Sequence, residues 1–304
     1  MKEFSITVLG SSAAIATDER NLTSHLINHC NNLFLIDCGE GTQFRLRELR
    51  VRTNRIKNIF ISHLHGDHFF GLIGLLSTMH LMRRTEELKI YGPPLLEDII
   101  RLQLKASETS LVYNLSFKPT QSEVEEVIFD DGRLTVSSIP LKHRIPTTGF
   151  IFREKLQPRH INKEAADRFG VPIIFYSSLA KGMDFIADDG EIIPNGVLTN
   201  PPDIPRTYAF ISDTVYNEDI IDSIMGCDLL YHESTFSHDL HQAAHDKMHS
   251  TNVQAATIAK LAGAKKLMLG HFSARYDDLD AMLTEAKKTF SETIIAEEGV
   301  AIYI

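Results

Sequence analysis

Histidine and aspartate cluster in the segment HLHGDH (63–68), which directly follows the apolar run NIFIS. An apolar run of this kind is typical of a buried strand, so the cluster is expected in the loop where that strand ends. His63 and His65 can face one centre, while Asp67 and His68 can turn to a second. Because imidazole and carboxylate groups together suit zinc, with bonds of about 2.0–2.2 Å, we predict a metal site. A structural cluster of histidines is the alternative.

Three more residues of the types that bind metals occur directly after apolar runs. His143 follows SIPLK, Asp213 ends YAFISD and His271 ends KLMLGH. A single residue in such a position is common and carries little meaning. Three of them in order behind an HxHxDH segment favour metal binding for all three.

The elements that must position these residues alternate along the chain. Short runs rich in Val, Ile and Phe indicate strands, and stretches of helical length lie between several of them. Strands that alternate with helices indicate an α/β layered fold. The predicted strands cover residues 4–10, 33–37, 58–62, 88–92, 133–141, 208–213, 228–233 and 266–271, and the predicted helices lie around 71–82, 94–105, 217–225, 251–262 and 277–289.

Residues 153–205 interrupt this rhythm. The segment combines scattered charge with a high density of proline, which breaks regular elements. Its prolines are Pro158, Pro172, Pro194, Pro201, Pro202 and Pro205. A stretch of this length without a strand-helix pattern predicts an inserted arm.

The composition is that of an ordinary soluble globular protein, with 304 residues of which 43% are hydrophobic and 23% charged. No window holds the roughly 18 consecutive apolar residues of a membrane span, and no leader precedes the first strand-like run. We therefore expect a cytoplasmic protein without a membrane partner. Cys30, Cys38 and Cys227 show no CxxC spacing, which fits a reducing compartment and predicts three small buried side chains.

The formal net charge of −9 counts against nucleic acid as a partner, because such binding depends on Lys and Arg contacts to phosphates. Charge is clustered, however. The segment RLRELRVRTNRIK (45–57) holds five arginines and one lysine against a single Glu48. This patch could meet a polyanion, or it could be a solvated helix face with its following loop.

The order HLHGDH, His143, Asp213 and His271 resembles the metallo-β-lactamase superfamily, and the surrounding sequence is similar to the ribonuclease Z family. The matching segments are LGSSAA, IDCGEGTQ, SHLHGDHFFGLIGLL, ISDT, HESTF, HST and LGHFSARY, which span nearly the whole chain. The resemblance implies a four-layer αββα sandwich with the metals at one edge. Residues 1–304 would then form a single domain from which the arm at about 153–205 protrudes.

The resemblance also implies a complete ligand set for two Zn²⁺ ions per subunit. The ligands are His63, His65 and His143 for one zinc, Asp67, His68 and His271 for the other, and Asp213 as the bridge between them. Two divalent ions about 3.5–4 Å apart can activate a shared hydroxide and clamp the attacking oxygen and the phosphate during an in-line displacement.

The activity implied is that of an endoribonuclease that removes the 3′ trailer from precursor tRNA and leaves a 3′-hydroxyl. Asp67 is the expected proton acceptor, because a carboxylate beside the attacking water can orient it. His249 with Glu233 resembles the family's pair that protonates the leaving 3′ oxygen. Asp37 and Glu40 are expected to brace the site or to be purely structural. The family usually forms homodimers, so a homodimer is implied here too.

Two features concerned with tRNA depart from the family pattern. The loop that usually reads PxKxRN appears as ATDERN (16–21), which keeps Arg20 and Asn21 but loses the proline and the lysine. The exosite of related enzymes carries a Gly-Pro element, whereas the corresponding segment FGVPIIFYSSLAKGMDF (169–185) has Pro172 without a Gly-Pro pair.

These departures leave a second hypothesis open, a phosphodiesterase of the same fold that acts on a small molecule or another nucleic acid. Such an enzyme would be indifferent to tRNA and to charge reversal in the 45–57 patch. A non-catalytic nucleic-acid-binding subunit is disfavoured by the complete ligand set. A redox di-iron site is disfavoured because His65 stands where those relatives typically have glutamate.

Overall fold

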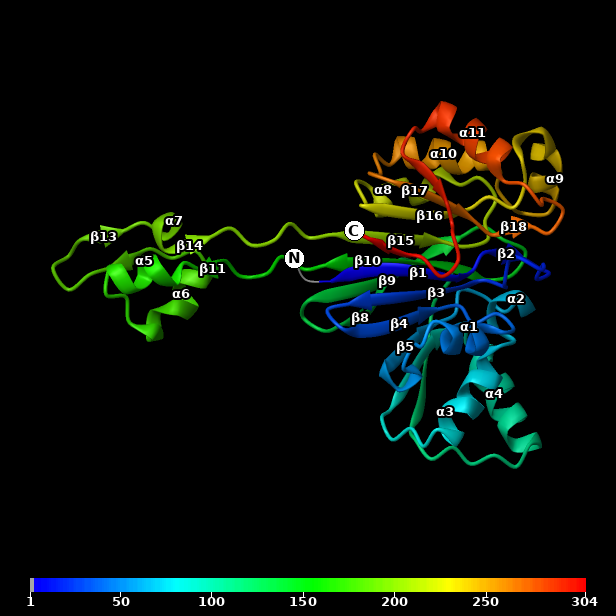
Figure 1. Ribbon diagram of the computed structural model, residues 1–304, viewed down its shortest axis with the longest axis horizontal. Helices are drawn as coiled ribbons and strands as arrows, with labels where there is room; N and C mark the ends of the chain where they lie inside the picture. The colour runs from blue at the N-terminus through cyan, green and yellow to red at the C-terminus, as the bar shows by residue number, and fades with distance from the viewer. Residues whose placement is uncertain (1–2) are drawn as a thin grey trace.

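Two sheets, each of seven strands, form the centre of the computed structural model, which describes residues 3–304 (Figure 1). In spatial order the first sheet consists of β20 (Ala301–Tyr303), β1 (Phe4–Gly10), β3 (Ser24–His29), β4 (Asn32–Ile36), β5 (Ile56–Phe60), β6 (Leu88–Gly92) and β7 (Leu115–Pro119). The second consists of β19 (Thr293–Ile295), β17 (Leu267–Gly270), β16 (Leu229–Glu233), β15 (Thr207–Ile211), β10 (Thr147–Glu154), β9 (Leu134–Leu141) and β8 (Glu126–Asp130). Short strands β2 (Ser12–Ala13) and β18 (Phe272–Ser273) pair beside them.

An aromatic core fills the space between the sheets. Phe60 stacks on Tyr91 with ring centroids 4.7 Å apart, and Phe210 stacks on Tyr231 at 4.9 Å. The central strands are buried on both faces, which explains why they are almost continuously apolar in sequence.

Helices cover the outer face of each sheet. On the first sheet they are α1 (Thr42–Glu48), α2 (Gly66–Phe69), α3 (Leu72–Leu81) and α4 (Leu95–Ala106), with a short 3₁₀ turn, η1 (Thr53–Arg55). On the second they are α8 (Ile221–Ile224), α9 (His241–Asp246), α10 (Asn252–Leu261) and α11 (Asp280–Thr289), with the turns η3 (Glu218–Ile220) and η4 (His238–Leu240). Each outer layer has its own apolar core, so the predicted four-layer αββα fold is confirmed.

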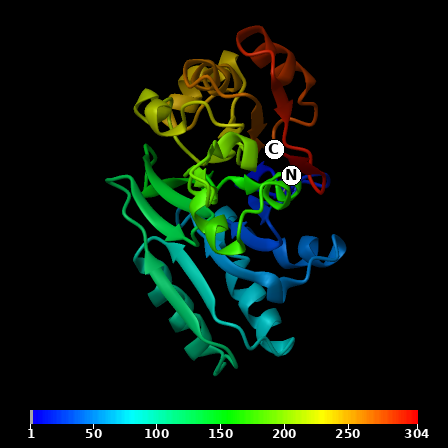
Figure 2. The same cartoon turned by 90° about the vertical axis from the view of Figure 1, so that its left-hand side faces the viewer.

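The chain between β10 and β15 leaves the sandwich and forms an arm, as Figures 1 and 2 show. Its elements are β11 (His160–Ile161), α5 (Lys163–Arg168), η2 (Ile173–Phe175), α6 (Tyr176–Ala180), β12 (Phe185–Ile186), β13 (Ile192–Ile193), α7 (Asn195–Leu198) and β14 (Thr199–Asn200). A small apolar core that includes Ala166, Leu179 and Leu198 holds the arm together. The arm therefore packs on itself and projects away from the sheets.

An ion pair closes the base of the arm, where its two connecting strands leave the sandwich. The guanidinium of Arg206 donates to both carboxylate oxygens of Glu154, at 2.8 Å from Nε and 2.7 Å from Nη2. His29 lies 3.0 Å from the same carboxylate, and Arg206 also donates to the oxygen of Ile304 at 2.7 Å. These contacts tie the arm to the first sheet and to the C-terminus.

The prediction for the three cysteines has a mixed outcome. Cys38 and Cys227 are buried as predicted, but the prediction is wrong for Cys30, which is partly exposed because it lies in the turn between β3 and β4. No helix within residues 3–304 is long and apolar enough to cross a membrane.

Candidate metal centre

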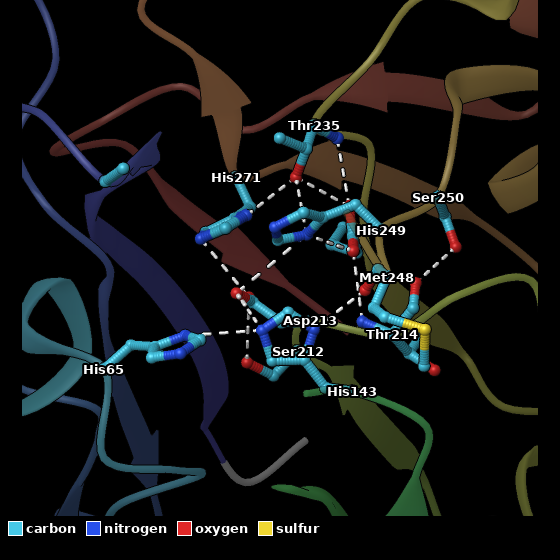
Figure 3. A network of polar contacts seen from close by, with 12 residues as sticks. His65, His143, Ser212, Asp213, Thr214, Thr235, Met248, His249, Ser250 and His271 are labelled. Carbon is cyan, nitrogen blue, oxygen red and sulfur yellow. Dashed lines mark hydrogen bonds and ion pairs between the residues drawn. The ribbon is translucent and has the colours of Figure 1, made fainter. Parts of the chain in front are cut away.

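The predicted ligands come together at one edge of the sandwich, where strands from both sheets end. In the second sheet, β15, β16 and β17 run parallel, so Asp213, Glu233 and His271 follow or end neighbouring strands at the same edge. In the first sheet β5 ends just before the segment 63–68. His143 follows β9, and Figure 3 shows it pointing toward Asp213.

Three imidazoles surround one side of the Asp213 carboxylate. His65 Nδ1 lies 3.0 Å from His63 Nε2 and 3.3 Å from His143 Nε2. The Asp213 Oδ2 atom lies 3.6 Å from His63 Nε2 and 3.8 Å from His143 Nε2. These four residues form a compact set of donor atoms that could hold one ion.

A second set lies around the other oxygen of the same carboxylate. His68 Nε2 and His271 Nε2 are 3.2 Å apart, and both lie near Asp67 Oδ2, at 3.5 and 3.4 Å. Asp213 Oδ1 is 3.4 Å from His68 Nε2 and 3.2 Å from His271 Nε2. Each oxygen of Asp213 therefore faces a different set of donors, which is the arrangement of a bridging carboxylate.

The spacing of the donor atoms fits zinc. A tetrahedral ion with bonds of about 2.0–2.1 Å places its ligand atoms about 3.3 Å apart, close to the distances within both sets. His63 is fully buried, and burial, together with neighbouring histidines, lowers its pKa and favours the neutral form that binds metals.

Buried hydrogen bonds hold the ligand rings from behind. The Asp37 carboxylate lies 2.7 Å from His68 Nδ1 and accepts from the Ser62 backbone at 2.7 Å. On the other sheet, His143 Nδ1 lies 2.8 Å from the Met248 carbonyl oxygen. Contacts of this kind fix the tautomer and the orientation of a ligating imidazole. Asp37 thus braces the site, whereas Glu40 is exposed and lies at the cleft wall.

His249 and Glu233 form a charged pair beside this centre. His249 Nδ1 lies 2.8 Å from Glu233 Oε1, and Thr235 Oγ1 donates to the other oxygen of Glu233 at 2.7 Å. Burial opposes protonation of His249, but the Glu233 charge and hydrogen bond outweigh it and raise the pKa of His249 to about 9. His249 is also near enough to Asp213 and His271 to form a third donor set, yet its Nδ1 is already engaged by Glu233.

The loop 11–21 touches the centre through its backbone. Ala14, which has a left-handed φ of 58°, donates its N–H to Asp67 Oδ2 at 2.7 Å. The two residues that this loop shares with the family pattern are structural here. Arg20 donates to the Tyr276 carbonyl at 2.6 Å, and the Asn21 side chain donates to Glu298 at 2.7 Å.

The donor sets open into a cleft of about 530 Å³. Its walls include Asp67, His65, Asp213, His249 and His271. A substrate that enters the cleft therefore meets the proposed ligands and the His249–Glu233 pair together.

Comparisons with known proteins match the chain over nearly its whole length. A protein named ribonuclease Z from Bacteroides fragilis strain YCH46 is 42% identical over 302 residues, which cover 99% of each chain. The chain belongs to the ribonuclease Z family. A second ribonuclease Z, from Porphyromonas gingivalis strain W83, is 41% identical over 99% of each chain. The solved structure of the short form of human tRNase Z matches with a TM-score of 0.70 and 29% identity over 98% of each chain.

One family model also matches part of the sequence. The model described as anti-Pycsar protein Apyc1 covers residues 4–157, so the first half of the chain falls within that family as well. This half contains the HLHGDH segment and His143. The ribonuclease Z relatives extend through the second half, which carries Asp213, His249 and His271.

Several residues at the site were not singled out from the sequence. Thr235 links Glu233 to His271, with its Oγ1 2.9 Å from His271 Nδ1. Lys247 and Arg275 line the cleft. Thr235 lies within HESTF and Arg275 within LGHFSARY. Both segments were singled out from the sequence, but the contacts of these two residues were not predicted.

Proposed function

We propose that this chain is a zinc-dependent endoribonuclease that removes the 3′ trailer from precursor tRNA and leaves a 3′-hydroxyl on the tRNA. The observation that carries the proposal is the Asp213 carboxylate, whose two oxygens face two separate sets of donor atoms. Its full-length relatives named ribonuclease Z and the human tRNase Z structure support the same substrate.

The ligand roles follow from the two donor sets. One Zn²⁺ is assigned to His63, His65 and His143, the other to Asp67, His68 and His271, and Asp213 to both. Zinc bound in such a site would lower the pKa of its bound water to near neutrality, and it would stabilise negative charge on a phosphate.

The chain's own residues move the protons. Asp67 is assigned as the acceptor of the proton from the attacking water, and the Ala14 N–H steadies its carboxylate. His249, oriented by Glu233, is assigned as the acid that protonates the leaving 3′ oxygen. The Glu233 carboxylate raises the pKa of His249, which favours the protonated form that a proton donor needs.

We further infer a cytoplasmic homodimer in which residues 1–304 form one metallo-β-lactamase-like domain and the arm at about 153–205 is an exosite for tRNA. The direction of the arm supports this, because it projects from the side of the sandwich opposite β2 and β18 (Figure 1) and could contact a large substrate at a distance from the cut. Residues 155–205 include five Lys or Arg and seven Asp or Glu residues, so the arm carries no excess of positive charge. Binding of RNA by the arm would therefore depend on shape and apolar contacts.

The direct test is to incubate zinc-loaded protein with a 3′-extended precursor tRNA and with bis(p-nitrophenyl) phosphate. Wild-type protein is expected to cut the tRNA just after the discriminator nucleotide and to hydrolyse the small ester, while an Asp67→Ala variant does neither. Metal analysis should find two zinc ions per subunit. Hydrolysis of the small ester alone would leave the metal chemistry standing and favour a phosphodiesterase with another substrate.

A further inference from the structure

Two exposed cations at the mouth of the cleft share one buried aromatic ring. Phe236 directly follows Thr235 and is only 2% exposed. The Arg275 guanidinium lies 5.0 Å and the Lys247 ammonium 5.9 Å from the centroid of its ring. Both distances are within the range of cation–π attraction, so the ring restricts where the two charged groups can lie.

The two cations belong to the reaction cleft. Lys247, Phe236 and Arg275 line the same cleft as His249 and His271. Lys247 is two residues before His249, and Arg275 is four residues after His271. Both side chains therefore line the same cleft as the proposed acid and one of the proposed ligands.

Neither cation is neutralised by a carboxylate within residues 3–304. Arg275 Nε donates to the uncharged hydroxyl of Ser273 at 3.1 Å. Some other lysines of this acidic chain are paired, as Lys155 is with Asp130 at 2.8 Å. Both cations therefore remain available to an anion that enters the cleft.

We propose that Arg275 and Lys247 bind the phosphate group next to the one that is cut, and that Phe236 positions them to do so. This proposal rests on the proposed function, because it requires a polynucleotide whose neighbouring phosphate reaches the cleft mouth. A guanidinium binds a phosphate through paired N–H donors, and the ammonium adds a second charge. The subsite would give the enzyme a preference for a nucleic acid strand over an isolated phosphodiester.

The test compares substrates with and without a neighbouring phosphate. Arg275→Ala, Lys247→Ala and the double variant are assayed on precursor tRNA and on bis(p-nitrophenyl) phosphate. Arg101→Ala is the matched control, because Arg101 is an exposed arginine on α4 that is paired with Glu97 far from the cleft. Circular dichroism and zinc content confirm that each variant is folded and loaded.

The expected result is a loss of kcat/KM on precursor tRNA of about tenfold to a hundredfold per cation, with a much smaller change on the small ester. The salt dependence of tRNA cleavage should become shallower, by about 0.7 in log–log slope for each phosphate-binding cation that is removed, and Arg275→Lys should recover part of the activity. The Arg101→Ala control should match wild type on both substrates.

Equal losses on the two substrates, or tRNA cleavage unchanged in the double variant, would overturn the subsite. Failure of the proposed function gives a different pattern, since wild-type protein itself would then hydrolyse the small ester and leave tRNA intact. That pattern would overturn both proposals. The wild-type assays thus test the activity, and the variants test the subsite.

Discussion

At the scale of single residues, the site separates the residues that hold metal from the pair that handles the leaving group. His249 is tied to Glu233 at 2.8 Å, and its raised pKa of about 9 suits a proton donor. The proposed ligands differ among themselves. Burial lowers the pKa of His63, whereas at His68 the neighbouring carboxylates outweigh burial and raise the pKa to about 10. The contacts of each imidazole, rather than its pKa alone, therefore distinguish the proposed acid from the proposed ligands.

The acid role of His249 predicts a substrate-dependent loss of activity. In a His249→Ala variant, kcat on precursor tRNA should fall by about a hundredfold to ten-thousandfold, because the 3′ alkoxide needs a proton to leave. Hydrolysis of bis(p-nitrophenyl) phosphate should fall much less, because nitrophenolate leaves without a proton. Single-turnover rates on both substrates check this, and equal losses would show that His249 acts as a ligand instead.

The buried Asp37 carboxylate predicts an effect on metal affinity. An Asp37→Ala variant removes the partner of His68 Nδ1 at 2.7 Å and should weaken zinc binding by about tenfold to a hundredfold. Competition with a chromophoric chelator measures the affinity. Glu40→Ala, which removes an exposed carboxylate from the cleft wall, is the control and should bind zinc like wild type. Unchanged affinity in Asp37→Ala would contradict the bracing role.

At the scale of elements, close backbone contacts fix the loops that carry the ligands. Gly71, which precedes α3, donates its N–H to the Cys38 carbonyl at 2.9 Å, and a Cβ added there would lie 2.1 Å from the Gly39 carbonyl oxygen. The adjoining Cys38 N–H donates to the His68 carbonyl at 2.7 Å. The loop after β4 and the ligand-bearing helix α2 are therefore locked together.

This contact predicts that Gly71→Ala is damaging. The methyl group must displace backbone atoms, so the variant should lose about 1–3 kcal/mol of unfolding free energy and should also bind zinc less tightly. Gly196→Ala on α7 is the matched control, because a Cβ there meets no atom within 4 Å. Chemical denaturation of both variants measures the difference, and equal stability would mean that the loop can shift without cost.

The sequence predicts the strongest elements and the ligands, but not the contacts between distant segments. The strands predicted at 4–10 and 88–92 have the same bounds as β1 and β6, because their apolar runs end sharply on both sides. The sequence does not indicate β10 as a strand, since TTGFIFRE merges into the insert that follows. The Ala14 amide on Asp67 joins residues 53 apart in the chain, and no local pattern indicates such a contact.

At the scale of the whole molecule, the sandwich and the arm meet at the Glu154–Arg206 pair. Burial opposes ionisation of Glu154, but hydrogen bonds from Arg206 and His29 outweigh it and lower the pKa of Glu154 to about 2. A carboxyl whose pKa is depressed on folding stabilises the folded state above its unfolded pKa of about 4.5. The stabilisation is lost as the pH falls through about 2.

Because the pKa of Glu154 is lowered on folding, the difference in unfolding free energy between wild type and Glu154→Gln should depend on pH. At pH 7 the variant should be less stable by about 2–3 kcal/mol, because the ionised partner of Arg206 is gone. The gap should narrow steadily between about pH 4.5 and 2. Denaturant unfolding across this range measures it, with Glu48→Gln, an exposed partner of Arg45, as the control. A gap that stays constant as the pH falls would contradict the shifted pKa.

The proposed activity is tested most directly by the ends of the RNA products. A precursor tRNA with a labelled trailer is cut by zinc-loaded protein, and mass spectrometry identifies both new termini. The expected products are a tRNA that ends at the discriminator nucleotide with a 3′-hydroxyl and a trailer that begins with a 5′-phosphate. A 2′,3′-cyclic phosphate on the tRNA, or cuts scattered along the trailer, would contradict the proposed activity.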